Sequence, residues 1–176
     1  NLDSNYFLRI GDIDIPELFF NPYKLDNEPL NELLSDIGGI VPSQVILLTG
    51  RPGSGKTTLA GYIGSQVTDF VANHKELKGR PHGKVVFISR EMSEFQMKIL
   101  ATKVANFDDI ILVKNSAKIE EMAEWTKQIY AMRPSLVILD SIQQLAREMV
   151  GSNLKNEEKI INDYKYFARI TNTPVI

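Results

Sequence analysis

The stretch "GRPGSGKT", from Gly50 to Thr57, holds the residues whose types and spacing most directly suggest chemistry. It fits the pattern G-x-x-x-x-G-K-[ST], with an apolar strand pattern before it and a helical pattern after it. Glycines let the backbone of such a loop curl with its N–H groups pointing inward, which forms an anion-binding hollow. The N-terminus of the following helix adds partial positive charge. The sequence therefore predicts a phosphate-binding loop, with a glycine-rich turn that binds nothing as the competing interpretation.

The side chains of this loop match the needs of a nucleoside triphosphate with Mg²⁺. Lys56 can reach the β- and γ-phosphates as a mobile cation, and the Thr57 hydroxyl can complete a Mg²⁺ coordination sphere that retains several waters. The expected nucleotide-binding residues are Gly50, Arg51, Pro52, Gly53, Ser54, Gly55, Lys56, Thr57 and Thr58.

A second metal-binding position is expected beside the loop. The apolar run "LVIL" ends in Asp140, which should lie at the C-terminal end of a buried strand and hold a Mg²⁺-bound water. The competing interpretation is a strand-end aspartate that caps the next helix. Many nucleotide-hydrolysing domains place a glutamate directly after this aspartate, but here the next residue is Ser141. The catalytic base must therefore come from elsewhere.

We predict that the base lies on a neighbouring strand. "VVFIS" is another buried strand pattern, and it is followed by Arg90 and Glu91. If this strand lies beside the Asp140 strand, Glu91 emerges at the same edge of the sheet and can polarise water for attack on the γ-phosphate. Glu91 and Lys56 are thus the expected catalytic residues, and a solvated acid at the start of a loop is the alternative for Glu91. A guanine-reading N-K-x-D motif is absent from the sequence, which argues against a GTPase.

The elements that must position these residues alternate along the chain. Strands are predicted at 44–49, 84–89, 109–114, 136–140 and 174–176. Because they are apolar on both faces and separated by helical patterns, they indicate one doubly wound α/β domain with a mainly parallel sheet and helices on both faces.

The helical patterns have recognisable ends. Residues 29–39 predict a short helix, and Ser93 opens a capping-box pattern for a helix that runs through about Val104. A third helical pattern stops before Pro134, and Asn156 precedes the last one.

Composition narrows the classes of function. The 176 residues are 43% hydrophobic, enough for one continuous core. With 20 basic and 22 acidic residues, the formal net charge of -2 excludes a protein that grips nucleic acid over its whole surface, so any such contact must come from local loops. Cysteine is absent, which excludes disulfides and cysteine-based zinc sites. No apolar run long enough for a membrane span and no signal-peptide pattern is present, so we expect a cytoplasmic protein without a membrane partner.

At this point the sequence resembles the RecA-like P-loop ATPases, and within them the RadA/Sms branch of bacterial DNA-repair ATPases. The resemblance covers roughly residues 30–176. It is carried by "ELLSDIGGIVPSQVILLTGRPGSGKTTL", "VVFISREMSEFQMKILATKV", "RPSLVILDSIQQL" and "ARITNTPVI". The phosphate loop is common to many families, whereas the Asp-Ser-Ile-Gln and Thr-Asn-Thr-Pro-Val segments are much more specific.

The resemblance implies a mechanism and partners. It implies that Lys56, Thr57 and Asp140 bind Mg-ATP and that the glutamate at position 91 is catalytic. It implies ATP and Mg²⁺ as cofactors, ring-shaped homo-hexamers, and single-stranded or branched DNA as partners in repair and recombination. In this class a sensor strand separates the aspartate strand from the loop strand. The predicted strand order is therefore 44–49, 174–176, 136–140, 84–89 and 109–114.

The sequence also departs from that branch. The usual N-terminal zinc finger is missing, and we expect residues 1–28 to form an extension to a core at 29–176 that stops before the sensor and the later DNA-binding loop. "REMSEFQ" also resembles DnaB-type replicative helicases. Three functions stay open: a DNA-dependent ATPase motor, a DnaB-type helicase, and a KaiC-like nucleotide-switched regulator.

Weaker features allow two interpretations each. Arg51 and Arg90 flank the expected pocket and are interpreted as solvated side chains, with nucleotide contact as the alternative. Residues 146–156 are expected to form a surface loop where RecA-like proteins carry their first DNA-facing loop. The aromatic residues of "LFFNPY" (18–23) are expected to pack on the domain itself or to reach an adjacent subunit.

Overall fold

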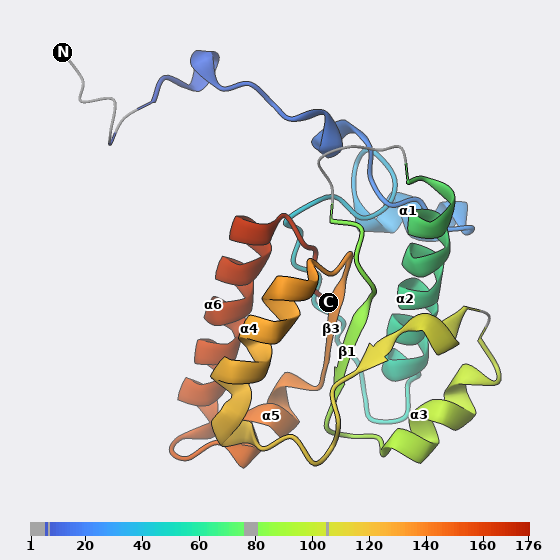
Figure 1. The fold of residues 1–176 in the computed structure, drawn as a ribbon, viewed down its shortest axis with the longest axis vertical. Helices are drawn as coiled ribbons and strands as arrows, with labels where there is room; N and C mark the ends of the chain where they lie inside the picture. Colours follow the sequence, from blue (N-terminus) through green and yellow to red (C-terminus); the bar gives the residue numbers. More distant parts are fainter. Residues whose placement is uncertain (1–5, 7, 76–80, 105) are drawn as a thin grey trace.

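A computed structural model describes residues 6, 8–75, 81–104 and 106–176 of the chain. Its centre is a parallel sheet of β1 (Val86–Ser89), β2 (Ile111–Leu112) and β3 (Val137–Asp140), in the order β2-β1-β3 (Figure 1). Isolated parallel bridges extend the sheet from Val137 to Val175 and from Val175 to Val45.

The predicted strand order is confirmed. Read from one edge to the other, the sheet runs from Val45 through Val175, β3 and β1 to β2. Several strands are shorter than expected. The segments 44–49 and 174–176 pair through isolated bridges rather than continuous ladders, and β2 is shorter than the predicted 109–114. At this edge Leu47 is 69% exposed.

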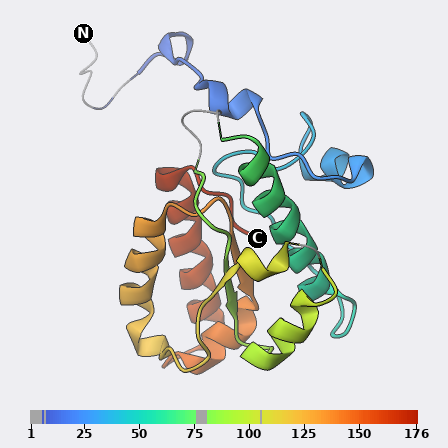
Figure 2. The same ribbon diagram turned by 45° about the vertical axis from the view of Figure 1, so that its right-hand side comes forward.

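The helices cover both faces of the sheet, as predicted. α2 (Lys56–Asn73) and α3 (Glu94–Ala101) lie on one side, while α4 (Met122–Met132), α5 (Ile142–Glu148) and α6 (Asn153–Thr171) lie on the other (Figures 1 and 2). α1 (Glu28–Leu34) packs next to α2. Short 3₁₀ turns occur at Ile10–Asp12, Glu17–Phe20, Phe107–Asp109 and Ile119–Glu121.

Side chains of the sheet alternate between two hydrophobic clusters. Val85 and Phe87 pack with α2 and α3, whereas Val86 and Ile88 pack with α4 and α6. These four side chains are fully buried. Successive residues of a strand point to opposite faces, so an unbroken apolar run is what a sheet covered on both faces requires.

Local capping explains several helix ends. The Asn27 side chain accepts a hydrogen bond from the Leu30 N–H at 3.0 Å at the start of α1, and Ser93 with Gln96 forms the predicted capping box. α4 ends at Met132, and its C-cap residue Arg133 has φ 47° and precedes Pro134.

The segment 146–156 corrects the sequence interpretation. It was expected to be a surface loop, but α5 runs to Glu148 and α6 begins at Asn153, so only Met149–Ser152 connects them. The buried Asn156 side chain donates to the Ala146 carbonyl oxygen at 3.1 Å and thereby joins the two helices. Similarly, α3 ends at Ala101 rather than near Val104.

Tyr23 packs on the domain itself, which is one of the two interpretations given for the aromatic segment 18–23. It is buried, and its hydroxyl donates to the Pro81 carbonyl oxygen at 2.6 Å. Its backbone also pairs with Ile40, and a Cβ on Gly39, at φ +98°, would lie 2.5 Å from the Tyr23 carbonyl oxygen. Glycine is therefore required at this close approach. Phe20, by contrast, is 64% exposed.

Two buried tyrosines should respond in opposite ways to loss of the hydroxyl. Tyr23→Phe removes a buried hydrogen bond and leaves the Pro81 carbonyl unpaired, so it should lower the free energy of unfolding by about 1–3 kcal/mol. The Tyr164 hydroxyl is buried without a hydrogen bond of normal geometry within the described residues. Burial raises the pKa of Tyr164 to about 12, and the nearby Thr126 side chain offsets only part of this. Tyr164→Phe should therefore leave stability unchanged or increase it. Denaturant unfolding of both variants tests this pair, and a larger loss for Tyr164→Phe would contradict it.

Within the described ranges, the structure contains no helix that is both long and apolar enough to cross a bilayer.

Candidate functional site

The predicted phosphate loop connects the segment at 44–49 to the N-terminus of α2 (Figure 1). Gly53 and Gly55 have φ values of 75° and 87°, a left-handed conformation that favours glycine. Gly55 occupies the position directly before α2, so the loop leads straight into the positive end of an 18-residue helix. The conformation that the glycine pattern predicted is therefore present.

Lys56 lies across its own loop. Its ammonium group donates to the carbonyl oxygens of Gly50 and Arg51, at 3.0 Å each. Both acceptors are neutral, and within the described residues Lys56 forms no ion pair. Its charge is thus free to pair with an anion that enters the loop, such as a phosphate group.

Thr57 and Asp140 meet although they are far apart in sequence. The Thr57 hydroxyl donates to Oδ2 of Asp140 at 2.8 Å, which joins the first turn of α2 to the end of β3. Asp140 is 7% exposed. Burial raises the pKa of this carboxyl group; the Thr57 hydrogen bond lowers it, the nearby Glu91 charge raises it further, and Lys56 lowers it.

This pair suits a divalent cation. Hydroxyl and carboxylate oxygens are the hard ligands that Mg²⁺ prefers. Within the described ranges Asp140 forms no ion pair, and a buried carboxylate in that position gains from a cation. In the described part of the chain, no group of three or more His, Cys, Asp or Glu residues is arranged to hold a metal. A site with few protein ligands fits Mg²⁺, which usually keeps several waters and binds phosphate oxygens.

Asp140 gives a testable pH dependence. The pKa of Asp140 in the folded protein lies above its ordinary value of 3.8. At pH values between these two pKa values, the folded protein binds more protons than the unfolded chain. The free energy of unfolding therefore falls as pH rises through this window. Asp140→Asn removes the charge and can still accept from Thr57. The ligand-free variant should therefore be more stable than the wild type at about pH 7, and the difference should shrink as pH falls toward the acid range. Thermal unfolding against pH measures this, and a variant less stable than the wild type at neutral pH would refute it.

Glu91 emerges at the same edge of the sheet as Asp140, which meets the geometric condition set by the sequence. Ser89 pairs with Asp140 in the β1–β3 ladder, and the Arg90 N–H donates to the Asp140 carbonyl oxygen at 2.8 Å. The Ser141 hydroxyl donates to Oε1 of the exposed Glu91 at 2.7 Å. Glu91 is therefore close enough to Asp140 for its charge to raise the pKa of that carboxyl.

Arg90 is not the solvated side chain that was expected. Its side chain is 5% exposed, and its guanidinium donates to the carbonyl oxygens of Asn115 and Ala117. Nε lies 3.5 Å from Oε2 of Glu148 on α5. Arg90 is buried because side chains alternate between the two faces of the sheet. It continues the series of Val86 and Ile88, which face α4 to α6. Arg51, in contrast, is exposed as predicted.

Ser141 is the site residue that the sequence interpretation missed. Its hydroxyl donates to Glu91 and also accepts from the Gln144 N–H at 3.3 Å as the N-cap of α5. The detectable signal was a serine at a strand end, three residues before a glutamine, which is a helix-start pattern. Its contact with Glu91 joins residues 50 positions apart and has no local pattern.

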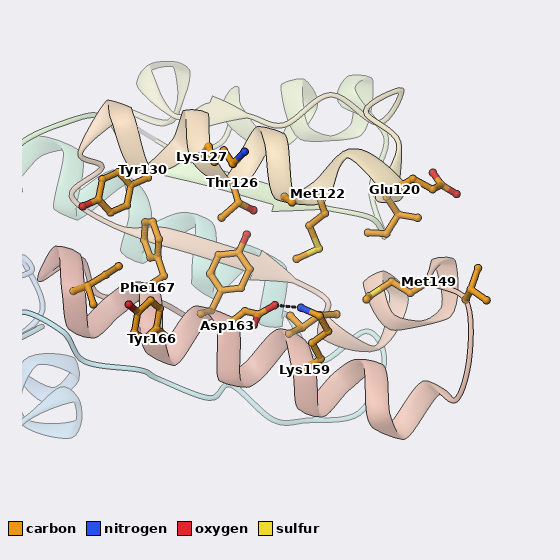
Figure 3. Close-up of a pocket in the computed structure, with 16 residues that line it drawn as sticks. Glu120, Met122, Thr126, Lys127, Tyr130, Met149, Lys159, Asp163, Tyr166 and Phe167 are labelled. Carbon is orange, nitrogen blue, oxygen red and sulfur yellow. Dashed lines mark hydrogen bonds and ion pairs between the residues drawn. The ribbon is translucent and has the colours of Figure 1, made fainter.

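A large groove lies elsewhere. It occupies about 630 Å³ between α4 and α6 and is mainly apolar, with Met122, Tyr130, Met149, Tyr164 and Phe167 among its lining residues (Figure 3). On its rim, Lys159 pairs with Asp163 (Figure 3). The residues predicted for nucleotide binding do not line it. The candidate site is thus defined by the backbone of the loop and the converging side chains, not by this groove.

The fold and this constellation of side chains define a RecA-like P-loop ATPase domain. The chain belongs to the AAA domain family, whose family model matches residues 15–176.

Its relatives point to one branch. The chain is 34% identical over 116 residues to the DNA repair protein RadA of Aquifex aeolicus, covering 66% of this chain and 23% of that protein. It is 31% identical over 144 residues to the DNA repair protein RadA of Halalkalibacterium halodurans, covering 82% of this chain and 28% of that protein. The chain thus spans about a quarter of the length of these curated relatives.

A solved structure supports the fold. The crystal structure of a KaiC-like protein from Pyrococcus horikoshii OT3 matches with a TM-score of 0.55 and 21% identity, covering 87% of this chain and 66% of that one.

Proposed function

We propose that this domain binds ATP together with Mg²⁺ and hydrolyses it. The observation that carries the proposal is the convergence of Thr57, Asp140 and Glu91 at one sheet edge, with Thr57 Oγ1 2.8 Å from the Asp140 carboxylate. In this proposal residues 50–58 bind the phosphates, and Thr57 and Asp140 hold the metal. Mg²⁺ supplies neutralisation of phosphate charge when it is bound.

The chain's own groups perform the remaining tasks. Lys56 exchanges its two carbonyl partners for phosphate oxygens and stabilises the charge that develops in the transition state. Glu91 accepts a proton from the attacking water through a carboxylate oxygen. Oε1 already accepts from Ser141, which leaves Oε2 available for that water.

We further propose that the protein acts as a DNA-dependent motor in DNA repair or recombination. Support comes from the curated relatives named DNA repair protein RadA, at 25–34% identity. The partner would be single-stranded or branched DNA, and the active form a homo-hexamer. Because the formal net charge is -2, DNA contact must be local. The exposed Arg147 and Lys155, on either side of the Met149–Ser152 connection, are the candidate cations.

ATPase assays test both levels of this proposal. Phosphate release by the full-length gene product should require Mg²⁺ and stop when EDTA is added. The rate of release should rise when single-stranded or forked DNA is added. Arg147→Ala with Lys155→Ala should reduce DNA stimulation and leave the basal rate unchanged. A matched control is Lys127→Ala on α4 with Arg133→Ala at the C-cap of that helix, two exposed cations outside the 146–156 segment.

The outcomes separate the alternatives. Hydrolysis that DNA leaves unchanged would contradict the motor and favour a nucleotide-switched regulator. Unwinding of a forked duplex would favour a DnaB-type helicase. Absence of Mg²⁺-dependent hydrolysis with and without DNA would contradict the ATPase assignment itself.

A further inference from the structure

The Ser141 hydroxyl connects the two acidic groups of the candidate site. Ser141 directly follows Asp140, and its Oγ donates to Oε1 of Glu91 at 2.7 Å. Within the described residues, the structure shows no other side-chain hydrogen bond to the Glu91 carboxylate. Ser141 therefore restrains an exposed side chain that is otherwise free to change rotamer.

Both partners of this hydrogen bond are fixed at the backbone. The Arg90 N–H binds the Asp140 carbonyl oxygen at 2.8 Å, next to the paired residues Ser89 and Asp140. The buried guanidinium of Arg90 then binds the Asn115 carbonyl oxygen at 2.9 Å. The sheet and the Arg90 contacts thus set the separation of the hydroxyl and the carboxylate.

The Ser141–Glu91 hydrogen bond orients the Glu91 side chain. Holding one carboxylate oxygen fixes the direction of the other, and correct orientation of a catalytic group contributes strongly to rate.

We propose that Ser141 is a positioning residue for Glu91. Its hydroxyl holds one oxygen of the Glu91 carboxylate and so sets the orientation of the other, while Ser141 itself touches neither nucleotide nor water in the reaction. The inference rests on the proposed function, because it assigns Ser141 a role only if Glu91 is the base. The inference also explains why a serine directly after Asp140 is useful, at the position where many nucleotide-hydrolysing domains place a glutamate.

The test must separate this hydrogen bond from the N-cap of α5, since Ser141 provides both. Ser141→Ala loses the hydroxyl and the cap, and loss of an N-cap costs about 0.5–2 kcal/mol of stability. Ser141→Gly loses the hydroxyl but retains most of the capping preference. Ser141→Thr keeps both functions and serves as the rescue variant.

Steady-state kinetics gives the diagnostic readout, because it separates kcat from KM. Ser141→Gly and Ser141→Ala should each lower kcat about 10-fold and leave KM within about 3-fold, because the base loses the donor that orients it. Ser141→Thr should retain the wild-type kcat. In a Glu91→Gln background, Ser141→Gly should have no further effect on kcat, since the group it positions is no longer a base.

A wild-type kcat in Ser141→Gly would overturn the inference, as would a rise in kcat, which would mean that the contact restrains Glu91 in an inactive orientation. Loss of stability in Ser141→Ala without a lower kcat would show a capping role alone and would also overturn it. Full activity in Glu91→Gln would instead contradict the proposed function, so the two failures are distinguishable.

Discussion

Replacing Glu91 by glutamine should slow ATP hydrolysis by roughly 10²- to 10⁴-fold and leave ATP affinity within a few-fold. Glutamine keeps the size of the side chain and can still accept from the Ser141 hydroxyl, but it cannot take a proton from water. The expected loss corresponds to about 3–5 kcal/mol of barrier. Affinity should persist because the phosphates are bound by the loop and Lys56, not by Glu91.

A matched control is Glu158→Gln, the same change at an exposed position on α6, remote from the loop. It should hydrolyse ATP at the wild-type rate. If Glu91→Gln also turns over normally, the base lies elsewhere and the strand neighbouring Asp140 does not supply it.

Replacing Lys56 by alanine should have the second large effect, this time on binding. Hydrogen bonds to charged groups contribute about 1.5–3 kcal/mol, so ATP affinity should fall by at least about 10- to 100-fold and turnover should become undetectable. The fold should remain intact because, among the residues that the structure describes, the hydrogen bonds of the Lys56 ammonium group go to two carbonyl oxygens of its own exposed loop.

Titration calorimetry with a non-hydrolysable ATP analogue measures this effect, with thermal unfolding to confirm the fold. Lys127→Ala, an exposed lysine on α4, is the control and should bind like the wild type. Retention of wild-type affinity by Lys56→Ala would contradict the assignment of the loop.

The parts of the site that depend on local patterns were predictable from the sequence. The loop follows from its glycines and its position between a strand and a helix, and positive φ values at Gly53 and Gly55 agree with it. The adjacency of β1 and β3 followed from a chemical requirement, because Asp140 and Glu91 are useful together only if these strands are neighbours. The place of 174–176 beside β3 followed instead from the resemblance to RecA-like proteins.

Other parts depend on contacts between distant segments. α5 spans Ile142–Glu148, too short to show a clear helical period, so the expected loop at 146–156 was wrong. The burial of Arg90 depends on carbonyl oxygens of Asn115 and Ala117, 25 and 27 residues away. An arginine that follows a strand is easily interpreted as solvated. Its burial becomes predictable only when the alternation of side chains between the two faces of the sheet is continued beyond the last residue of the strand.

The role of Glu91 can be measured from the chemical state of the nucleotide that the protein retains after a single turnover. Protein in excess over radiolabelled ATP is mixed with Mg²⁺ and quenched over time, with wild type and Glu91→Gln compared side by side. The wild type should convert bound ATP to ADP, whereas Glu91→Gln should bind the same amount and retain it as ATP. Conversion to ADP at equal rates in both proteins, or a wild type that retains no nucleotide, would contradict this role.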